Sequence, residues 1–124
     1  SAMSIKVLIA EDDSFLVKAY KMKLSASGFR VVTAFDGESV LKKARQEKPN
    51  IILLDIIMPK KSGFDVLREL KKDKETQSIP VIILSNLGQE SDLQKGKELG
   101  AVDYLIKAEL TLEEILEKIQ KTAL

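Results

Sequence analysis

Short apolar runs alternate with segments of helical period along the whole chain, and this alternation restricts the fold more than any other feature of the sequence. Strands are predicted at residues 5–10, 30–34, 51–55, 81–84 and 102–106, and all but the second consist almost wholly of apolar residues. Strands that alternate with helices predict a parallel sheet with helices on both faces, and continuous apolar strands are typical of a sheet covered on both sides. The chain is therefore predicted to be one α/β domain with five strands and five helices.

The fourth predicted helix is the least firmly anchored of the five. It covers residues 91–99, has a capping signal at Ser91 and Gln94, and carries Gly96 near its middle. A glycine inside a helix costs about 1 kcal/mol relative to alanine, and few large apolar residues lie in this segment. A helix held by so few apolar contacts is a candidate moving part.

The composition excludes several kinds of chemistry. The sequence contains no Cys and no His, which excludes disulfides, thiolate metal sites and cysteine nucleophiles, and also zinc–histidine sites and Ser-His-Asp catalysis. Twenty basic and nineteen acidic residues are scattered along the chain and leave a net charge of +1, which argues against direct binding of nucleic acid or of a membrane. The partner is expected to be a protein or a small ligand.

The ends of the sequence and its apolar runs predict a cytoplasmic domain. No apolar stretch approaches the roughly 18 residues of a membrane-spanning helix, and no signal-like leader is recognised. The Ser1-Ala2 pair ahead of Met3 is interpreted as a remnant of an expression vector, so the domain is expected to cover residues 3–124.

Four of the predicted strands end on polar residues of different kinds. These are Glu11, Asp12 and Asp13 after the first strand, Asp55 at the end of the third, Ser85 after the fourth and Lys107 after the fifth. Ligands of parallel α/β sheets bind outside the carboxyl ends of the strands. We therefore expect an acidic pair, a single carboxylate, a hydroxyl and an ammonium group to meet at one edge of the sheet.

This set of side chains suits a site for a metal ion and a phosphoryl group. Mg²⁺ prefers oxygen ligands and is usually held by one or two carboxylates together with a phosphate oxygen, and Asp12, Asp13 and Asp55 meet that description. Asp55 is the predicted nucleophile, because a carboxylate can attack a phosphoryl group whose charge a metal neutralises. Lys107 and Ser85 are predicted to contact phosphoryl oxygens. Each residue alone also has an ordinary explanation, such as helix capping, so the hypothesis depends on their joint occurrence.

The chain resembles the receiver domain of bacterial two-component response regulators over nearly its full length. The resemblance depends on the acidic residues 11–13, on residues 54–59 together with Gly63, on Ser85 and on residues 104–107. It implies a flavodoxin-like, doubly wound sheet with strand order 2-1-3-4-5, an order taken from the family. It also implies a signalling switch that catalyses its own phosphorylation and dephosphorylation and is not otherwise an enzyme.

The resemblance implies a role for each matching residue. Asp12 and Asp13 would bind Mg²⁺, with Asp13 the more direct ligand and the Ile57 backbone carbonyl a further one. Asp55 would be the phosphoacceptor and Lys107 the lysine that contacts the phosphate. Ser85 would be the switch hydroxyl, and Tyr104 the aromatic residue that changes rotamer. A sensor histidine kinase or a phosphotransfer protein would donate the phosphoryl group. A downstream effector protein or domain would recognise the surface of the fourth helix, the fifth strand and the fifth helix, and dimerisation on phosphorylation is left open.

The chain departs from the family pattern at four positions near the predicted site. Ala108 follows Lys107 where the family usually has proline, and since a cis bond before a non-proline residue costs about 3 kcal/mol, this peptide is expected to be trans or strained. Asn86 stands where a small residue is usual and is expected to crowd the entry of phosphate. Ile57 and Leu87 cannot orient a water molecule, so slow self-hydrolysis of the aspartyl phosphate is predicted.

Two other functions compete with the switch. A metal-dependent phosphohydrolase with Asp55 as nucleophile would be expected to carry a second acid two residues later, where Ile57 stands. A receiver-like scaffold that binds proteins without being phosphorylated is favoured by Asn86 and Ala108. Uptake of a phosphoryl group from a small donor in the presence of Mg²⁺ would separate the switch from the scaffold.

Overall fold

Five parallel strands form one sheet in the order β2-β1-β3-β4-β5. The computed structural model describes residues 5–124, and the strands are β1 (Lys6–Ala10), β2 (Arg30–Ala34), β3 (Ile51–Leu54), β4 (Val81–Ser85) and β5 (Asp103–Ile106). The predicted strands are confirmed, with bounds that differ by one residue at most, and so is the order taken from the family. Residues 1–4, with the Ser1-Ala2 pair and the predicted domain start at Met3, lie outside the described residues.

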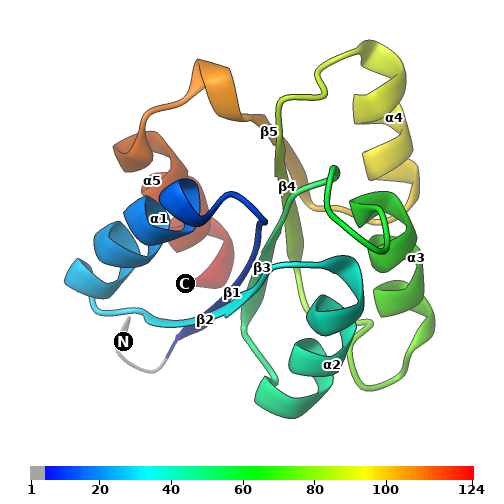
Figure 1. Cartoon of the computed structure of the whole chain (residues 1–124), viewed down its shortest axis with the longest axis horizontal. Coiled ribbons are helices and arrows are strands. Elements are labelled where there is room, and N and C mark those ends of the chain that lie inside the picture. The colour runs from blue at the N-terminus through cyan, green and yellow to red at the C-terminus, as the bar shows by residue number, and fades with distance from the viewer. Residues whose placement is uncertain (1–4) are drawn as a thin grey trace.

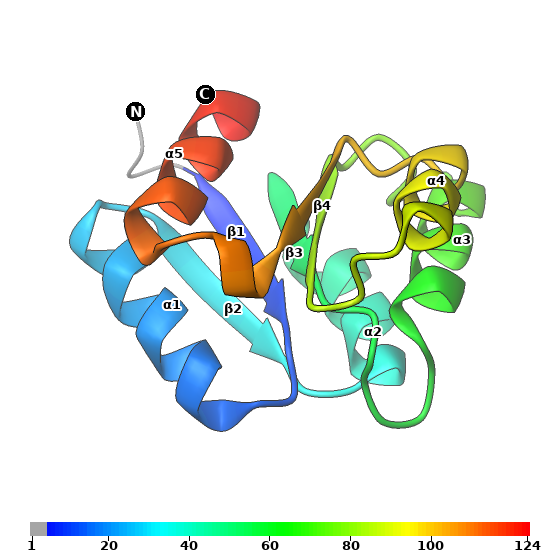
Figure 2. The same cartoon turned by 90° about the horizontal axis from the view of Figure 1, so that it is seen from above.

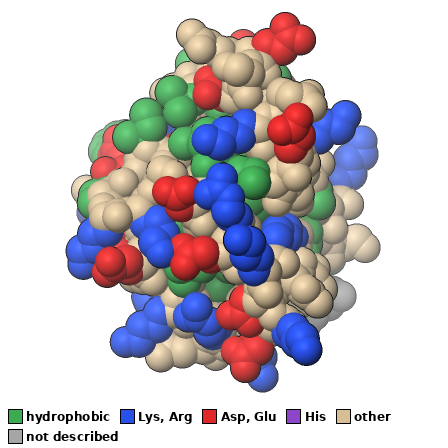
Figure 3. Space-filling view, turned by 90° about the vertical axis from the view of Figure 1, so that its right-hand side faces the viewer, with side chains coloured by type: hydrophobic (Ala, Val, Ile, Leu, Met, Phe, Trp, Pro, Cys, Tyr) green, Lys and Arg blue, Asp and Glu red, His purple; other side chains and the backbone are tan. Residues whose placement is uncertain are grey.

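Helices cover both faces of the sheet, as Figures 1 and 2 show. α1 (Ser14–Ala26) and α5 (Leu112–Ala123) lie together on one face, and α2 (Gly37–Glu47), α3 (Gly63–Lys72) and α4 (Glu90–Glu98) lie on the other. Within residues 5–124, none of these helices combines the length and the apolar character needed to cross a bilayer. On the side of α3 and α4, basic and acidic side chains are interspersed (Figure 3).

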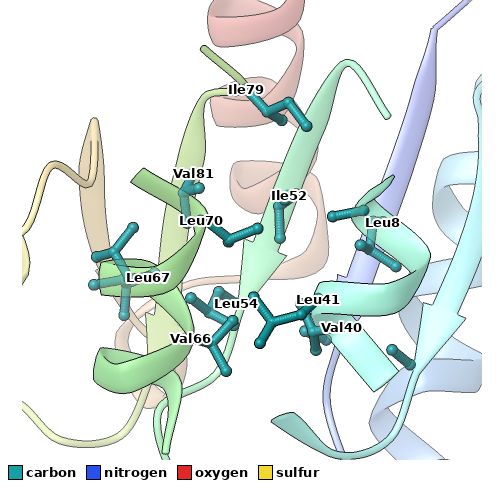
Figure 4. Close-up of a cluster of buried hydrophobic side chains, with 14 of the residues drawn as sticks. Leu8, Val40, Leu41, Ile52, Leu54, Val66, Leu67, Leu70, Ile79 and Val81 are labelled. Atoms are coloured by element: carbon teal, nitrogen blue, oxygen red, sulfur yellow. The ribbon is translucent and has the colours of Figure 1, made fainter. Parts of the chain in front are cut away.

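The core consists of two apolar layers that the alternation of side chains along the strands creates. Leu8, Ile52 and Leu54 point toward α2 and α3, where Figure 4 shows them packed among side chains of both helices. Their neighbours Ile51 and Leu53 point to the opposite face, toward α1 and α5. All four residues of β3 are buried, as expected for the central strand of a sheet covered on both sides.

The strand register brings the carboxyl ends of the strands to one edge. Ala10 pairs with Leu54, and the last residue of β4, Ser85, pairs with Ile106 of β5. The residues that follow these strand ends are therefore neighbours in space although they are far apart in the sequence.

Helix α4 begins one residue before its predicted start, and its glycine has a packing role. It begins at Glu90, and the Asp92 carboxylate accepts a hydrogen bond from the Gln89 N–H at 3.2 Å; the predicted cap at Ser91 and Gln94 is wrong. Gly96 is buried, and a Cβ at this position would lie 2.7 Å from Ile83 Cδ1 and 2.9 Å from the Tyr104 ring. Gly96 therefore permits α4 to pack closely on the sheet.

A short 3₁₀ helix, η2 (Lys107–Glu109), follows β5 directly. No peptide bond among residues 5–124 is cis, so the bond between Lys107 and Ala108 is trans. This agrees with the first of the two conformations expected from the sequence.

Candidate functional site

An open pocket of about 370 Å³ lies at the carboxyl ends of β1, β3, β4 and β5. It is lined by Glu11, Asp12, Asp13, Leu16, Asp55, Ile57, Ser85, Asn86 and Lys107. The set contains each charged or hydroxyl side chain that the sequence predicted to meet there. Tyr104 lies on β5 and is not one of the lining residues.

Lys107 joins two of the acidic side chains. Its ammonium group donates a hydrogen bond to Asp55 Oδ2 at 2.9 Å and a second one to Glu11 Oε1. Both carboxylates are buried, with Glu11 3% and Asp55 6% exposed. A lysine between two buried carboxylates offsets part of the cost of removing them from water.

The loop after β3 holds the Asp55 carboxylate in place from its other side. Asp55 Oδ1 accepts the Ile56 N–H at 2.7 Å, and the Ile56 carbonyl accepts the Gly63 N–H at 2.7 Å. A Cβ at Gly63 would overlap the Asp55 carbonyl oxygen. The loop can therefore return this closely to β3 only because residue 63 is glycine.

Burial and pairing shift the pKa values of Glu11 and Lys107. Burial raises the pKa of the Glu11 carboxyl, and the hydrogen bond from Lys107 opposes this effect only in part. Burial also disfavours the charge of Lys107, but the bonds to Glu11 and Asp55 outweigh it, so the pKa of Lys107 is raised as well. The ammonium group therefore stays charged at neutral pH.

Three carboxylates converge closely enough to bind one metal ion. Oxygen atoms of Glu11, Asp12 and Asp55 all lie within 4.8 Å of one another. Asp12 is exposed, and its carboxylate has no hydrogen-bond or ion-pair partner among the described residues 5–124. When all are ionised, these three acids and Lys107 carry a net charge of −2, which matches a divalent cation.

Asp13 has a different position from the one expected of the more direct metal ligand. It is the N-cap of α1, and its Oδ1 accepts the N–H groups of Phe15 at 3.0 Å and Leu16 at 3.3 Å. The acids that cluster with Asp55 are instead Glu11 and Asp12. Sequence reasoning gave Glu11 no role of its own, and the run of three acids was the only signal for it.

Ser85 and Tyr104 are connected through the backbone of Leu87. The buried Ser85 hydroxyl accepts the Leu87 N–H at 3.2 Å, and the Tyr104 hydroxyl donates to the Leu87 carbonyl oxygen. Burial raises the pKa of Tyr104, so its hydroxyl remains protonated at neutral pH and can donate this bond. A displacement of Ser85 would thus be passed to Tyr104 through one residue.

Ile57 lies at the rim of the pocket. Its side chain is 65% exposed and offers no group that could activate water. The position of the second acid expected of a phosphohydrolase is therefore occupied by an exposed apolar group. The ligand role of the Ile57 carbonyl stays a prediction.

Comparisons with known proteins agree with this geometry. The family model of the response regulator receiver domain matches residues 7–120. The probable transcriptional regulator ycf27 of Guillardia theta is 40% identical over 124 residues, which cover 95% of this chain and 48% of that protein. This chain therefore spans about half the length of that curated relative.

Two solved structures are similar over nearly their whole length. The receiver domain of the Francisella response regulator 1452 has 30% identity and a TM-score of 0.89, and the comparison covers 97% of both chains. The Mn²⁺-bound form of response regulator Rcp1 has 28% identity and a TM-score of 0.83, with 94% of this chain and 92% of that chain covered.

Proposed function

Because the chain belongs to the response regulator receiver domain family, whose members are phosphorylation-dependent switches of two-component systems, we propose that Asp55 is its phosphoacceptor. The contact that carries the proposal is the bond from Lys107 to Asp55 Oδ2, which places an ammonium group beside the one buried carboxylate at the end of β3. A phosphoryl group on Asp55 would therefore lie within reach of a positive charge.

The proposed reaction is the transfer of a phosphoryl group to an oxygen of Asp55. The new bond joins that oxygen to phosphorus, while the bond from phosphorus to the donor breaks and its electron pair leaves with the donor. The donor is a histidine nitrogen of a sensor kinase or phosphotransfer protein, or the acetate oxygen of acetyl phosphate. The Ile56 N–H orients the carboxylate, and Lys107 and Ser85 contact the oxygens of the transferred group.

A divalent metal ion is part of the proposal, and Mg²⁺ is the ion we assign. The hard carboxylate oxygens of Glu11, Asp12 and Asp55 suit it, and the Ile57 carbonyl is a further proposed ligand. When bound, Mg²⁺ neutralises the negative charge of the phosphoryl oxygens and so lowers the repulsion that Asp55 would meet. The Mn²⁺-bound form of Rcp1 supports a divalent ion. We place Asp12 ahead of Asp13 as the direct ligand, because the Asp13 carboxylate already caps α1.

The proposed signal passes from Asp55 to the surface of α4, β5 and α5. The phosphoryl group would attract the Ser85 hydroxyl, which now accepts the Leu87 N–H, and would thereby change the position of the Leu87 carbonyl that holds Tyr104. Near Tyr104, the exposed side chains of Leu93 and Val102 could contact an effector protein or domain. The identity of kinase and effector, phosphorylation-dependent dimerisation and a cytoplasmic location stay predictions.

Incubation with acetyl phosphate and Mg²⁺, followed by mass measurement, tests the proposal. The wild type should gain one phosphoryl group, and Asp55→Asn, which keeps the acceptor for the Ile56 N–H, should gain none. Asp65→Asn, which removes a surface carboxylate of α3, is the matched control and should be labelled like the wild type. Labelling that persists in Asp55→Asn would refute the assignment, and a wild type without label would favour the protein-binding scaffold.

A further inference from the structure

A side-chain hydrogen bond joins the loop after β4 to the turn after β5. Asn86 Oδ1 accepts the Ala108 N–H at 3.0 Å, across 22 positions of the sequence. Proline has no N–H to donate, so this bond requires a residue other than proline at position 108. The two residues that depart from the family pattern at these loops are thus partners in one contact.

Both ends of this bond lie next to residues of the proposed site. Asn86 follows Ser85, the proposed hydroxyl contact, and Ala108 follows Lys107, whose ammonium group binds Asp55. Asn86 also lines the pocket itself. This hydrogen bond therefore joins the two segments just beyond the Ser85–Ile106 pair that ends the strand ladder.

A second bond connects the same two parts of the chain. The Tyr104 hydroxyl donates to the Leu87 carbonyl oxygen, so the loop after β4 is joined to β5 as well as to the turn that follows it. If Ser85 moves on phosphorylation, the Tyr104 bond changes with it. β5 holds Lys107 on one side, where Ile106 pairs with Ser85, and the bond between Asn86 and Ala108 holds it on the other, because it acts on the residue that follows Lys107 directly.

We propose that Asn86 is a positioning residue for phosphoryl acceptance, and this inference rests on the proposed function. By holding the Ala108 N–H, Asn86 keeps the backbone of Lys107 at the distance from Ser85 at which both groups reach the incoming phosphoryl oxygens. Lysine is a flexible side chain with a compact charge, so its placement depends on its backbone, and small misplacements of such groups slow group transfer. Asn86 touches neither the proposed metal ligands nor Asp55 through any bond within residues 5–124.

The test compares Asn86→Ala with Asn50→Ala. Asn50 Oδ1 accepts the Lys6 N–H at 2.8 Å, which is a bond of the same kind, also exposed, at the opposite end of the sheet. Each variant loses one amide-to-backbone bond, so a general loss of stability should be similar in both. Three quantities are measured: the rate of labelling by acetyl phosphate at saturating Mg²⁺, the Kd for Mg²⁺, and hydrogen exchange of the Ala108 amide.

We expect Asn86→Ala to take up the phosphoryl group about two- to fivefold more slowly than the wild type. This decrease corresponds to the low end of the free energy that a hydrogen bond contributes, because this bond is exposed. The Kd for Mg²⁺ should be unchanged, and the Ala108 amide should exchange faster. Asn50→Ala should match the wild type in all three measurements. A labelling rate in Asn86→Ala equal to that of the wild type, or an equal decrease in Asn50→Ala, would overturn the positioning role.

The exchange measurement separates this inference from the proposed function. A wild type that takes up no phosphoryl group would overturn the proposed function and the role of Asn86 in it. An Ala108 amide that exchanges equally fast in wild type and Asn86→Ala would overturn the contact itself, whatever the result of labelling.

Discussion

Replacing Asp12 by Asn should stabilise the metal-free protein and weaken its binding of Mg²⁺. Two carboxylates 4.8 Å apart, the largest separation within the cluster of Glu11, Asp12 and Asp55, repel each other by about 3 kcal/mol at an effective dielectric constant near 20 and by about 1 kcal/mol in water. Asp12 is exposed, so the lower value applies to each of its two pairs. Attraction to Lys107 offsets part of the sum, and a gain of about 1 kcal/mol is expected without metal.

The effect on the metal-bound protein has the opposite sign. A divalent ion in direct contact with a carboxylate oxygen gains about 4 kcal/mol from that charge even at the dielectric constant of water. The neutral Asn still offers an oxygen ligand, so only part of this energy is lost. We expect the Kd for Mg²⁺ to rise at least about 30-fold, which corresponds to about 2 kcal/mol.

Asp13→Asn is the matched control, since it removes a neighbouring acid of the same pocket. Asn caps helices as well as Asp does, so the bonds to the N–H groups of Phe15 and Leu16 should persist and the Kd for Mg²⁺ should change less than about threefold. Thermal unfolding in a chelator gives the first quantity, and titration with Mg²⁺ by calorimetry gives the second.

The reverse pattern would refute the reasoning. If Asp13→Asn lost Mg²⁺ and Asp12→Asn kept it, Asp13 would be the direct ligand, as the family resemblance implied, and would have to leave its cap to bind the ion. If Asp12→Asn destabilised the metal-free protein, the three carboxylates would not be under mutual repulsion.

Three further perturbations follow from other parts of the structure. Leu87→Glu should speed decay of the aspartyl phosphate, because it supplies a group that can orient water where the wild type has none; an unchanged decay of the label would contradict this. Gly96→Ala should lower the free energy of unfolding by about 1–3 kcal/mol, because a Cβ would meet Ile83 Cδ1 at 2.7 Å. A higher free energy of unfolding, measured in urea, would mean that the greater helix propensity of alanine outweighs this clash. Hydrogen bonds lower the pKa of Glu114 from its ordinary 4.5, so the stabilising effect of this carboxylate is present above pH 4.5 and is lost as the pH falls through the lowered pKa. Glu114→Gln should therefore show a smaller decrease in Tm on acidification than the wild type. An equal decrease in both proteins would rule out this contribution.

The strands could be predicted because buried parallel strands have a distinctive composition, whereas their order in the sheet came from the family resemblance. β3 is apolar throughout, β4 is apolar up to its last residue, Ser85, and every residue of both strands is buried, so short apolar runs mark them in the sequence. The start of α4 could not be predicted in the same way. Residues 89–92 are all polar and several can cap a helix, so the sequence does not distinguish the observed cap at Gln89 from the predicted one at Ser91.

The residues of the candidate site likewise differ in how far the sequence predicts their roles. Asp55, Ser85 and Lys107 each stand alone at the end of an apolar run, so their convergence could be predicted from the topology of a parallel sheet. Three consecutive acids after β1 could not be distinguished, because their side chains point in different directions once the chain turns from strand to helix. Glu11 is buried against Lys107, Asp12 faces the pocket and Asp13 caps α1.

The charges of the site explain why phosphorylation and metal binding should be coupled. The three acids and Lys107 carry a net charge of −2. A phosphoryl group brings between one and a half and about two negative charges, while Asp55 loses the charge of its own carboxylate, so the site gains between about one half and one negative charge. Lys107 already binds the carboxylates of Glu11 and Asp55, so its single positive charge cannot also neutralise the phosphoryl group while it stays bound to both. A divalent ion bound by Glu11, Asp12 and Asp55 would neutralise these carboxylates and let Lys107 bind another group. The same ammonium group can then bind Asp55 in the resting protein and a phosphoryl oxygen in the phosphorylated one, without any change in the strands that carry these residues.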